Sequence, residues 1–76
     1  MSADELKRLL KAVPFRPFTV YLPSDTSFPV PHPYFVLLTP NGRTMVVAHE
    51  NSDAVDILDV PLITRVNVEA KRGAET

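Results

Sequence analysis

The segment SFPVPHPYFVLL, residues 27–38, carries a proline at every second position from 29 to 33 within an apolar, strand-like pattern. A proline has no backbone N–H and cannot donate a hydrogen bond to a neighbouring strand. In an extended chain the N–H groups of alternate residues point to the same edge, so these prolines remove donors from one edge only. We therefore expect an edge strand here, paired with residues 18–22 on its other side, whose proline edge resists further pairing.

The residues before this segment predict one short helix. Ser2 and Glu5 have the spacing of a capping box, in which each side chain binds the other residue's backbone N–H. Leucines at 6, 9 and 10 and Val13 follow at spacings of three and four and form one apolar stripe, which Pro14 ends. A helix of about three turns is marginal alone, so we expect it to lie across a sheet and close its open end.

Short apolar runs separated by turn signals divide the rest of the chain into strands. Asn41-Gly42 between VLLTP and TMVVAH predicts a hairpin, and the stretch from His32 to Phe35 predicts a single helical turn that starts at Pro33. Residues 54–60 fit either a strand or an irregular return, and ITRVNV forms the last strand. The predicted fold is α+β, mostly β: one N-terminal helix and a small curled antiparallel sheet or partly open barrel of five to six strands.

Length and composition limit the chain to one small domain. Seventy-six residues, 45% of them hydrophobic and 22% charged, are typical of one globular unit, which we place at residues 1–68 with a flexible C-terminal tail at 69–76. There is no cysteine, no apolar run of the ~20 residues that span a membrane, and no signal-peptide core at the N-terminus. We expect a soluble, cytoplasmic protein.

The usual signatures of catalysis and of cofactor binding are missing from the sequence. Two glycines cannot build a phosphate-binding loop, and His32 and His49 are not spaced from each other or from acidic residues as in familiar metal motifs. The serines at 24, 27 and 52 lie in turn-like clusters without a nucleophile elbow. The prediction is a protein that is not an enzyme and has no catalytic residues, metal or cofactor, with a small metal-dependent enzyme as the least favoured alternative.

Several sequence strings resemble known families. PFRPFTVYL, VPHPYFV, PNGRTMVV and DILDVPLITRVNV resemble a family of very short uncharacterised bacterial proteins with a PFRPF, HPEFV, SPxGRT, IDLxxVT-like pattern, to which no activity is assigned. Tyr34 stands where that pattern usually has an acidic residue, and Ser24 to Ser27 where an Asp-Gly turn is common. The order of elements is also similar to SH3-like and Sm-like barrels, and that likeness implies peptide or RNA binding and assembly into rings, without implying a role for any residue.

The function predicted from these observations is a non-catalytic interaction module that binds a protein partner or forms a homo-oligomer. A net charge of −1 weakens the alternative, an RNA-binding Sm-like module, and nothing in the sequence indicates a membrane or a small-molecule substrate. The expected surface combines a proline-free strand edge with a corner around Phe15, Arg16 and Tyr34, because aromatic and arginine side chains often anchor interfaces. The candidate interaction residues are Phe15, Arg16, Tyr21, His32, Tyr34 and Arg43.

Overall fold

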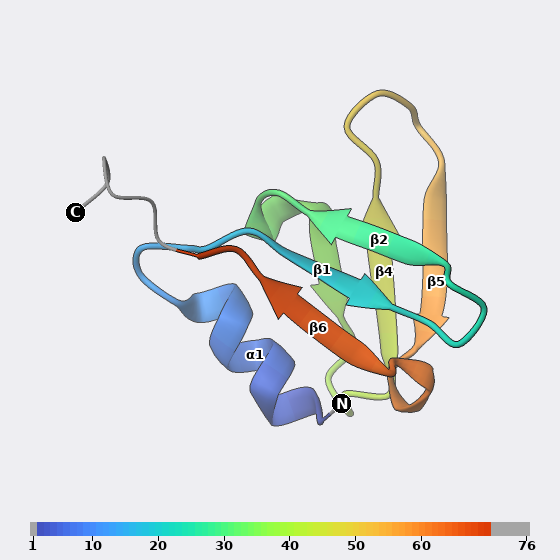
Figure 1. The fold of residues 1–76 in the computed structure, drawn as a ribbon, viewed down its shortest axis with the longest axis horizontal. Helices are drawn as coiled ribbons and strands as arrows, with labels where there is room; N and C mark the ends of the chain where they lie inside the picture. The colour runs from blue at the N-terminus through green and yellow to red at the C-terminus, as the bar shows by residue number, and fades with distance from the viewer. Residues whose placement is uncertain (1, 71–76) are drawn as a thin grey trace.

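A computed structural model describes residues 2–70 and shows one helix followed by six strands in two antiparallel, three-stranded sheets (Figure 1). Sheet A has the strand order β2-β1-β6, and sheet B has the order β3-β4-β5. The elements are α1 (Ala3–Lys11), β1 (Phe18–Tyr21), β2 (Ser27–Val30), the 3₁₀ turn η1 (Pro33–Phe35), β3 (Val36–Leu38), β4 (Thr44–Ala48), β5 (Val55–Asp59), the 3₁₀ turn η2 (Val60–Leu62) and β6 (Arg65–Val68).

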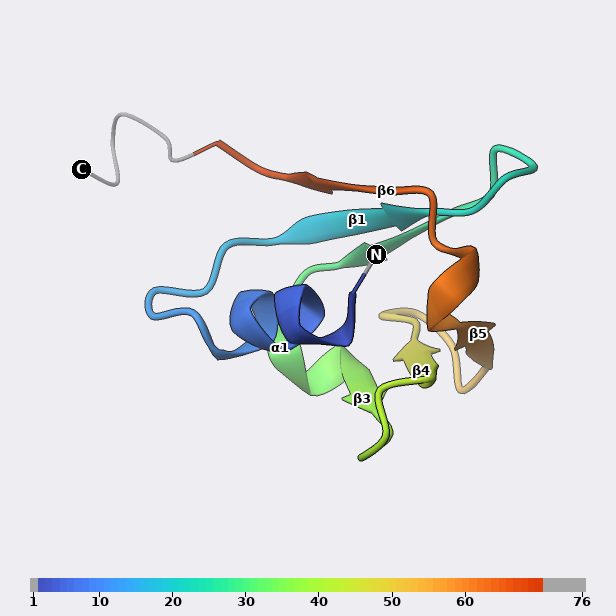
Figure 2. The ribbon, with the colours of Figure 1, turned by 90° about the horizontal axis from the view of Figure 1, so that it is seen from below.

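The predicted α+β class with an N-terminal helix and antiparallel strands is confirmed, but the strands do not form one curled sheet. The two sheets lie as separate layers with α1 to one side (Figure 2), and no closed barrel exists within residues 2–70. The chain passes from one sheet to the other through the two 3₁₀ turns, each of which begins at or next to a proline. Proline fixes φ and removes a donor, so these crossings cannot extend a strand ladder between the sheets.

The predicted proline edge is confirmed at β2 for Pro29 alone, because the strand ends at Val30, before Pro31 and Pro33. This strand is the last in sheet A, and Pro29 lies opposite Thr19 on β1. The Leu22 N–H donates to the Thr26 carbonyl at 2.8 Å, so Leu22 and Thr26 form a hydrogen-bonded pair. Such pairs alternate along an antiparallel ladder, so Val20 and Phe28 form the next one. Pro29 falls between those pairs and faces away from β1, so its missing N–H costs the ladder nothing.

Helix α1 begins as predicted. The Glu5 N–H donates to the Ser2 hydroxyl at 3.3 Å, and the Ser2 hydroxyl and N–H donate to the Glu5 carboxylate at 3.0 and 3.3 Å. These bonds, the side-chain bond first, hold the pKa of Glu5 below its ordinary value of 4.5. The predicted stripe is only partly correct, because the helix ends at Lys11 and Val13 is 96% exposed. A residue before proline avoids helical backbone angles, so Val13 leaves the helix face.

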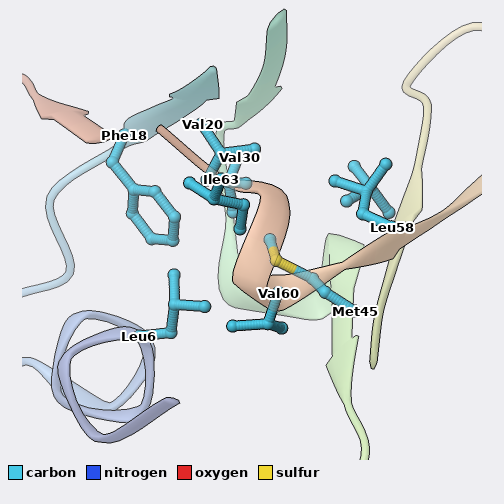
Figure 3. Close-up of a cluster of buried hydrophobic side chains, with 9 residues drawn as sticks. Leu6, Phe18, Val20, Val30, Met45, Leu58, Val60 and Ile63 are labelled. Atoms are coloured by element: carbon cyan, nitrogen blue, oxygen red, sulfur yellow. The ribbon is translucent and has the colours of Figure 1, made fainter. Parts of the chain in front are cut away.

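The core lies between the two sheets and α1. Leu6 reaches in from the helix, Phe18 and Val20 from β1, and Met45 and Leu58 from sheet B (Figure 3). The complete buried set is Leu6, Phe18, Val20, Val30, Met45, Val47, Leu58, Val60 and Ile63. Leu6 therefore joins α1 to the core between the sheets, although the single curled sheet that the helix was expected to close is not formed.

The remaining local predictions are confirmed at η1 and at the hairpin between β3 and β4, where Gly42 has a φ of 73°. Residues 55–59, within the stretch that the sequence left open, form a strand. Of the predicted tail, residues 71–76 lie outside the described residues. Glu69, its first residue, donates its N–H to the Pro17 carbonyl at 2.9 Å. No helix among residues 2–70 is long and apolar enough to cross a membrane.

Candidate interaction surface

The outward face of sheet A is polar. Phe18 and Val20 of β1 point into the core, so the residues between and after them point outward. Cross-strand pairing places this face at Thr19, Tyr21, Ser27, Pro29, Arg65 and Asn67. On it the Arg65 guanidinium lies 4.0 Å from the centre of the Tyr21 ring. A face of this composition is typical of an antiparallel sheet that is open to water.

The outward face of sheet B is mostly apolar instead. Met45, Val47 and Leu58 are buried, so the alternate residues of β4 and β5 point away from the core. The pairing aligns Leu37, Val46 and Ile57 in one row across the three strands, with Ala48 and Val55 on one side of this row and the polar pair Thr44 and Asp59 on the other. We call the apolar residues, Leu37, Val46, Ala48, Val55 and Ile57, the outer face of sheet B.

The apolar side chains of this face are unusually exposed to water. Leu37 is 64% exposed, Ile57 71% and Val55 54%, and Val46 is half-buried. Single exposed apolar side chains are ordinary on a protein surface, but a contiguous row of them across three strands indicates an interaction site.

The direction of the backbone groups along β5 follows from two hydrogen bonds. The Val60 N–H donates to the Arg43 carbonyl at 2.9 Å, so Val60 and Arg43 form a hydrogen-bonded pair. The Thr39 N–H donates to the Thr44 carbonyl at 2.9 Å, so the backbone N–H and C=O groups of Thr44 point toward β3. Thr44 therefore makes no backbone hydrogen bond with its register partner Asp59 on β5. Alternation along the ladder then directs the N–H and C=O groups of residues 55, 57 and 59 to the outer edge of β5.

The predicted corner brings together three of the six candidate residues. The His32 and Tyr34 rings have centroids 4.7 Å apart and the Phe15 and His32 rings 6.3 Å apart, while Phe15 also contacts the core residue Phe18 at 6.0 Å. Tyr34 is 90% exposed, whereas Phe15 is half-buried. The corner is thus a short aromatic ladder that runs from the core to an exposed tyrosine.

The other three candidates lie elsewhere. Arg16 donates from Nη2 and Nε to the Glu69 carbonyl at 2.7 and 3.1 Å, which ties it to the chain just after β6. Tyr21 is on the outward face of sheet A under Arg65, and Arg43 is in the β3–β4 hairpin. Since Glu69 and Arg65 are at opposite ends of β6, Arg16 does not join Arg65 in a common basic cluster. The six candidates therefore do not form one surface.

The residues considered for catalysis are held in local structure. His49 Nε2 lies 2.5 Å from Asp56 Oδ2 in a half-buried pair that bridges β5 and the residue after β4. Ser24 bonds the Thr26 hydroxyl at 3.2 Å, and Ser52 accepts the Ala54 N–H at 2.9 Å. Within residues 2–70 no three His, Cys, Asp or Glu side chains are close enough together to hold a metal ion.

The sequence interpretation missed the outer face of sheet B, although a signal was present. In the runs VLL and MVVA the residues directed to both faces of the strand are apolar, whereas a strand with one water-exposed face alternates apolar and polar residues. Such a run is typical of a strand covered on both faces, and this domain covers only one face of sheet B.

Comparison with protein-family models, curated proteins and solved structures finds no match to this chain.

Proposed function

We propose that this protein is a non-catalytic interaction module that binds a protein partner or its own copies through the outer face of sheet B. The supporting observation is the contrast between the two sheets: the outward side of sheet A is polar, whereas on sheet B a row of apolar side chains crosses all three strands, with the polar pair Thr44 and Asp59 on one side of it. Packing a partner onto the apolar face gives β3, β4 and β5 the second cover that their sequence pattern calls for.

The exposed side chains are large enough to matter energetically. Full burial of a leucine, isoleucine or valine contributes about 1.5–3 kcal/mol, and Leu37, Val55 and Ile57 each keep more than half of their surface in contact with water. Covering each one therefore contributes about 1–2 kcal/mol before the costs of association are subtracted. Three such side chains on one small face support a weak to moderate complex and not a permanent one.

The chemistry of this face favours protein over RNA. Nucleic acids are bound through basic side chains on phosphates, and the outward-pointing residues of β3, β4 and β5 include no lysine or arginine, their one charged side chain being that of Asp59. We infer that sheets A and B correspond to an SH3-like or Sm-like barrel opened along its sides. Members of that architecture bind peptides as well as RNA. Retention on heparin that falls steeply with added salt would favour the RNA alternative instead.

The test uses peptides selected from a displayed random library on the immobilised protein. Enriched peptides are titrated against the wild type, against Leu37→Ser on the outer face of sheet B, and against Asn67→Ser on the outward face of sheet A as the matched control. Removing the leucine, at 64% exposure, forfeits about 1.4 kcal/mol, which corresponds to about tenfold weaker binding. Asn67→Ser is expected to leave the affinity unchanged.

Two results contradict the proposal. Either no sequence is enriched, or the enriched peptides bind the Leu37→Ser variant as tightly as the wild type. If binding is instead lost with Tyr34→Ser alone, the aromatic corner and not the face is the binding site.

A further inference from the structure

The edge of β5 is the longer of the two edges of sheet B, since β5 has five residues and β3 has three, and no proline interrupts it. The edge of β2 has Pro29 at an outward-facing position. The edge of β6 lies beside α1, with Leu9 and Val66 lining the open groove between them. At β5 no proline or lysine occurs. Its charged residues are Asp56, which pairs with His49, and Asp59, and the strand pairs only with β4 among the described residues. Exposed edges without such protection tend to pair with another strand.

We propose that β5 pairs antiparallel with β5 of a second copy of this chain, with Ile57 of both copies on the two-fold axis. The inference rests on the proposed interaction role, because it identifies a second copy of this chain as the partner at the β5 edge of that surface. The pairing joins the two copies of sheet B into one six-stranded sheet whose apolar outer faces are continuous.

The backbone of β5 is self-complementary in this register. Residues 55, 57 and 59 direct their N–H and C=O groups outward, and a two-fold at Ile57 sets 55 opposite 59 of the second copy and 57 opposite 57. Every outward group then meets an outward group, giving three hydrogen-bonded pairs and about six hydrogen bonds. A shift by one residue pairs outward-facing residues with inward-facing ones and forms no ladder.

Charges and proline select this register over its neighbours. Shifting the copies by two residues in one direction places Asp56 directly opposite Asp56 and Asp53 opposite Asp59, and like charges in facing positions are destabilising. Shifting them in the other direction places Val55 opposite Pro61, which has no N–H and belongs to η2. In the proposed register Asp59 faces Val55 and Asp56 faces Leu58, so no two charges oppose each other within the strand.

The size of the contact sets the expected strength. An edge of five residues buries less than the ~1,200–2,000 Å² of a stable protein complex, although Ile57 of one copy packs beside Ile57 of the other on the outer face. The dimer is therefore expected to exchange rapidly and to depend on concentration.

The experiment exploits the absence of cysteine from the chain. Cα atoms of a hydrogen-bonded antiparallel pair lie about 5.5 Å apart, a separation that a disulfide spans. Ile57→Cys is expected to form a disulfide-linked dimer under mild oxidation at least about tenfold faster than Leu37→Cys, because pre-paired thiols react at a higher effective concentration. Leu37→Cys is the matched control, since it is similarly exposed on the same face at the opposite edge of sheet B.

Two further variants test the register. Val55→Cys and Asp59→Cys each crosslink slowly alone and rapidly when mixed, because each faces the other across the axis. Sedimentation of the wild type should show a dimer that is reduced by Val55→Pro, which removes an outward N–H at the first residue of β5, where proline is tolerated.

The outcomes separate this inference from the proposed function. Faster crosslinking of Leu37→Cys than of Ile57→Cys overturns the edge pairing in favour of face-to-face packing. Equal rates together with a wild-type monomer at all concentrations overturn self-pairing altogether. Neither result alters the peptide titration with Leu37→Ser, which tests the outer face independently.

Discussion

Replacing Leu6 by alanine should remove much of the stability of this domain. Leu6 has no exposed surface and is the only helix residue in the fully buried core (Figure 3). The substitution deletes about three methyl or methylene groups, worth about 2.4 kcal/mol by transfer alone at ~0.8 kcal/mol each. The cavity left behind raises the cost to about 2.7–5 kcal/mol, as for buried leucines generally.

That loss is large for a chain of this size. At about 0.05–0.15 kcal/mol per residue, the whole domain has a stability of about 4–11 kcal/mol. A loss of about 3 kcal/mol lowers the melting temperature by about 12–24 °C, because each kcal/mol corresponds to about 4–8 °C in a domain of 60–100 residues.

The assay is thermal and urea unfolding followed by circular dichroism, with Leu37→Ala as the matched control. The control makes the same chemical change on the outer face of sheet B, where it leaves no cavity, and is expected to cost less than about 1 kcal/mol. Equal effects of the two substitutions would refute the reasoning that α1 is held to the sheets by its buried leucine.

Two other substitutions test the helix start and the protected edge. Ser2→Ala removes the cap of α1 and should cost about 0.5–2 kcal/mol at neutral pH. Ser2 holds the pKa of Glu5 below 4.5, so the part of its contribution that depends on the Glu5 carboxylate is present above that pH and is lost as the pH falls through the lowered pKa. The gap between the melting temperatures of variant and wild type should therefore narrow in acid. A constant gap would contradict the assignment. Pro29→Val restores an outward N–H on β2 and should leave the melting temperature nearly unchanged while increasing light scattering at high concentration. Unchanged scattering would show that this proline does not protect the edge.

Local signals in the sequence predicted local structure well. Ser2 and Glu5 marked the start of the helix, Asn41-Gly42 marked the hairpin, and the alternate prolines identified an edge strand. Each of these depends on hydrogen bonds between residues close in the chain, or on a donor that proline lacks, so no knowledge of distant contacts was needed.

The features that were missed depend on distant contacts. Whether six strands form one sheet or two depends on the path of residues 31–35 and 60–62, where prolines favour a turn without fixing its direction. The sequence did not reveal the exposure of Leu37 and Ile57, because in an apolar strand the residues on either face could equally well be the buried ones. Among the candidate residues, Arg16 was chosen by type, and its bond to the Glu69 carbonyl joins segments 53 residues apart.

Hydrogen exchange of the β5 amides as a function of protein concentration tests the central claim most directly. In dilute protein the amides of Val55, Ile57 and Asp59 should exchange quickly and those of Asp56 and Leu58 slowly, because only the latter face β4. On concentration the first three should become protected, while the amide of Asn51, an exposed residue in the loop before β5, stays unchanged. Exchange at Val55, Ile57 and Asp59 that is the same at all concentrations would contradict pairing of this edge with a second copy.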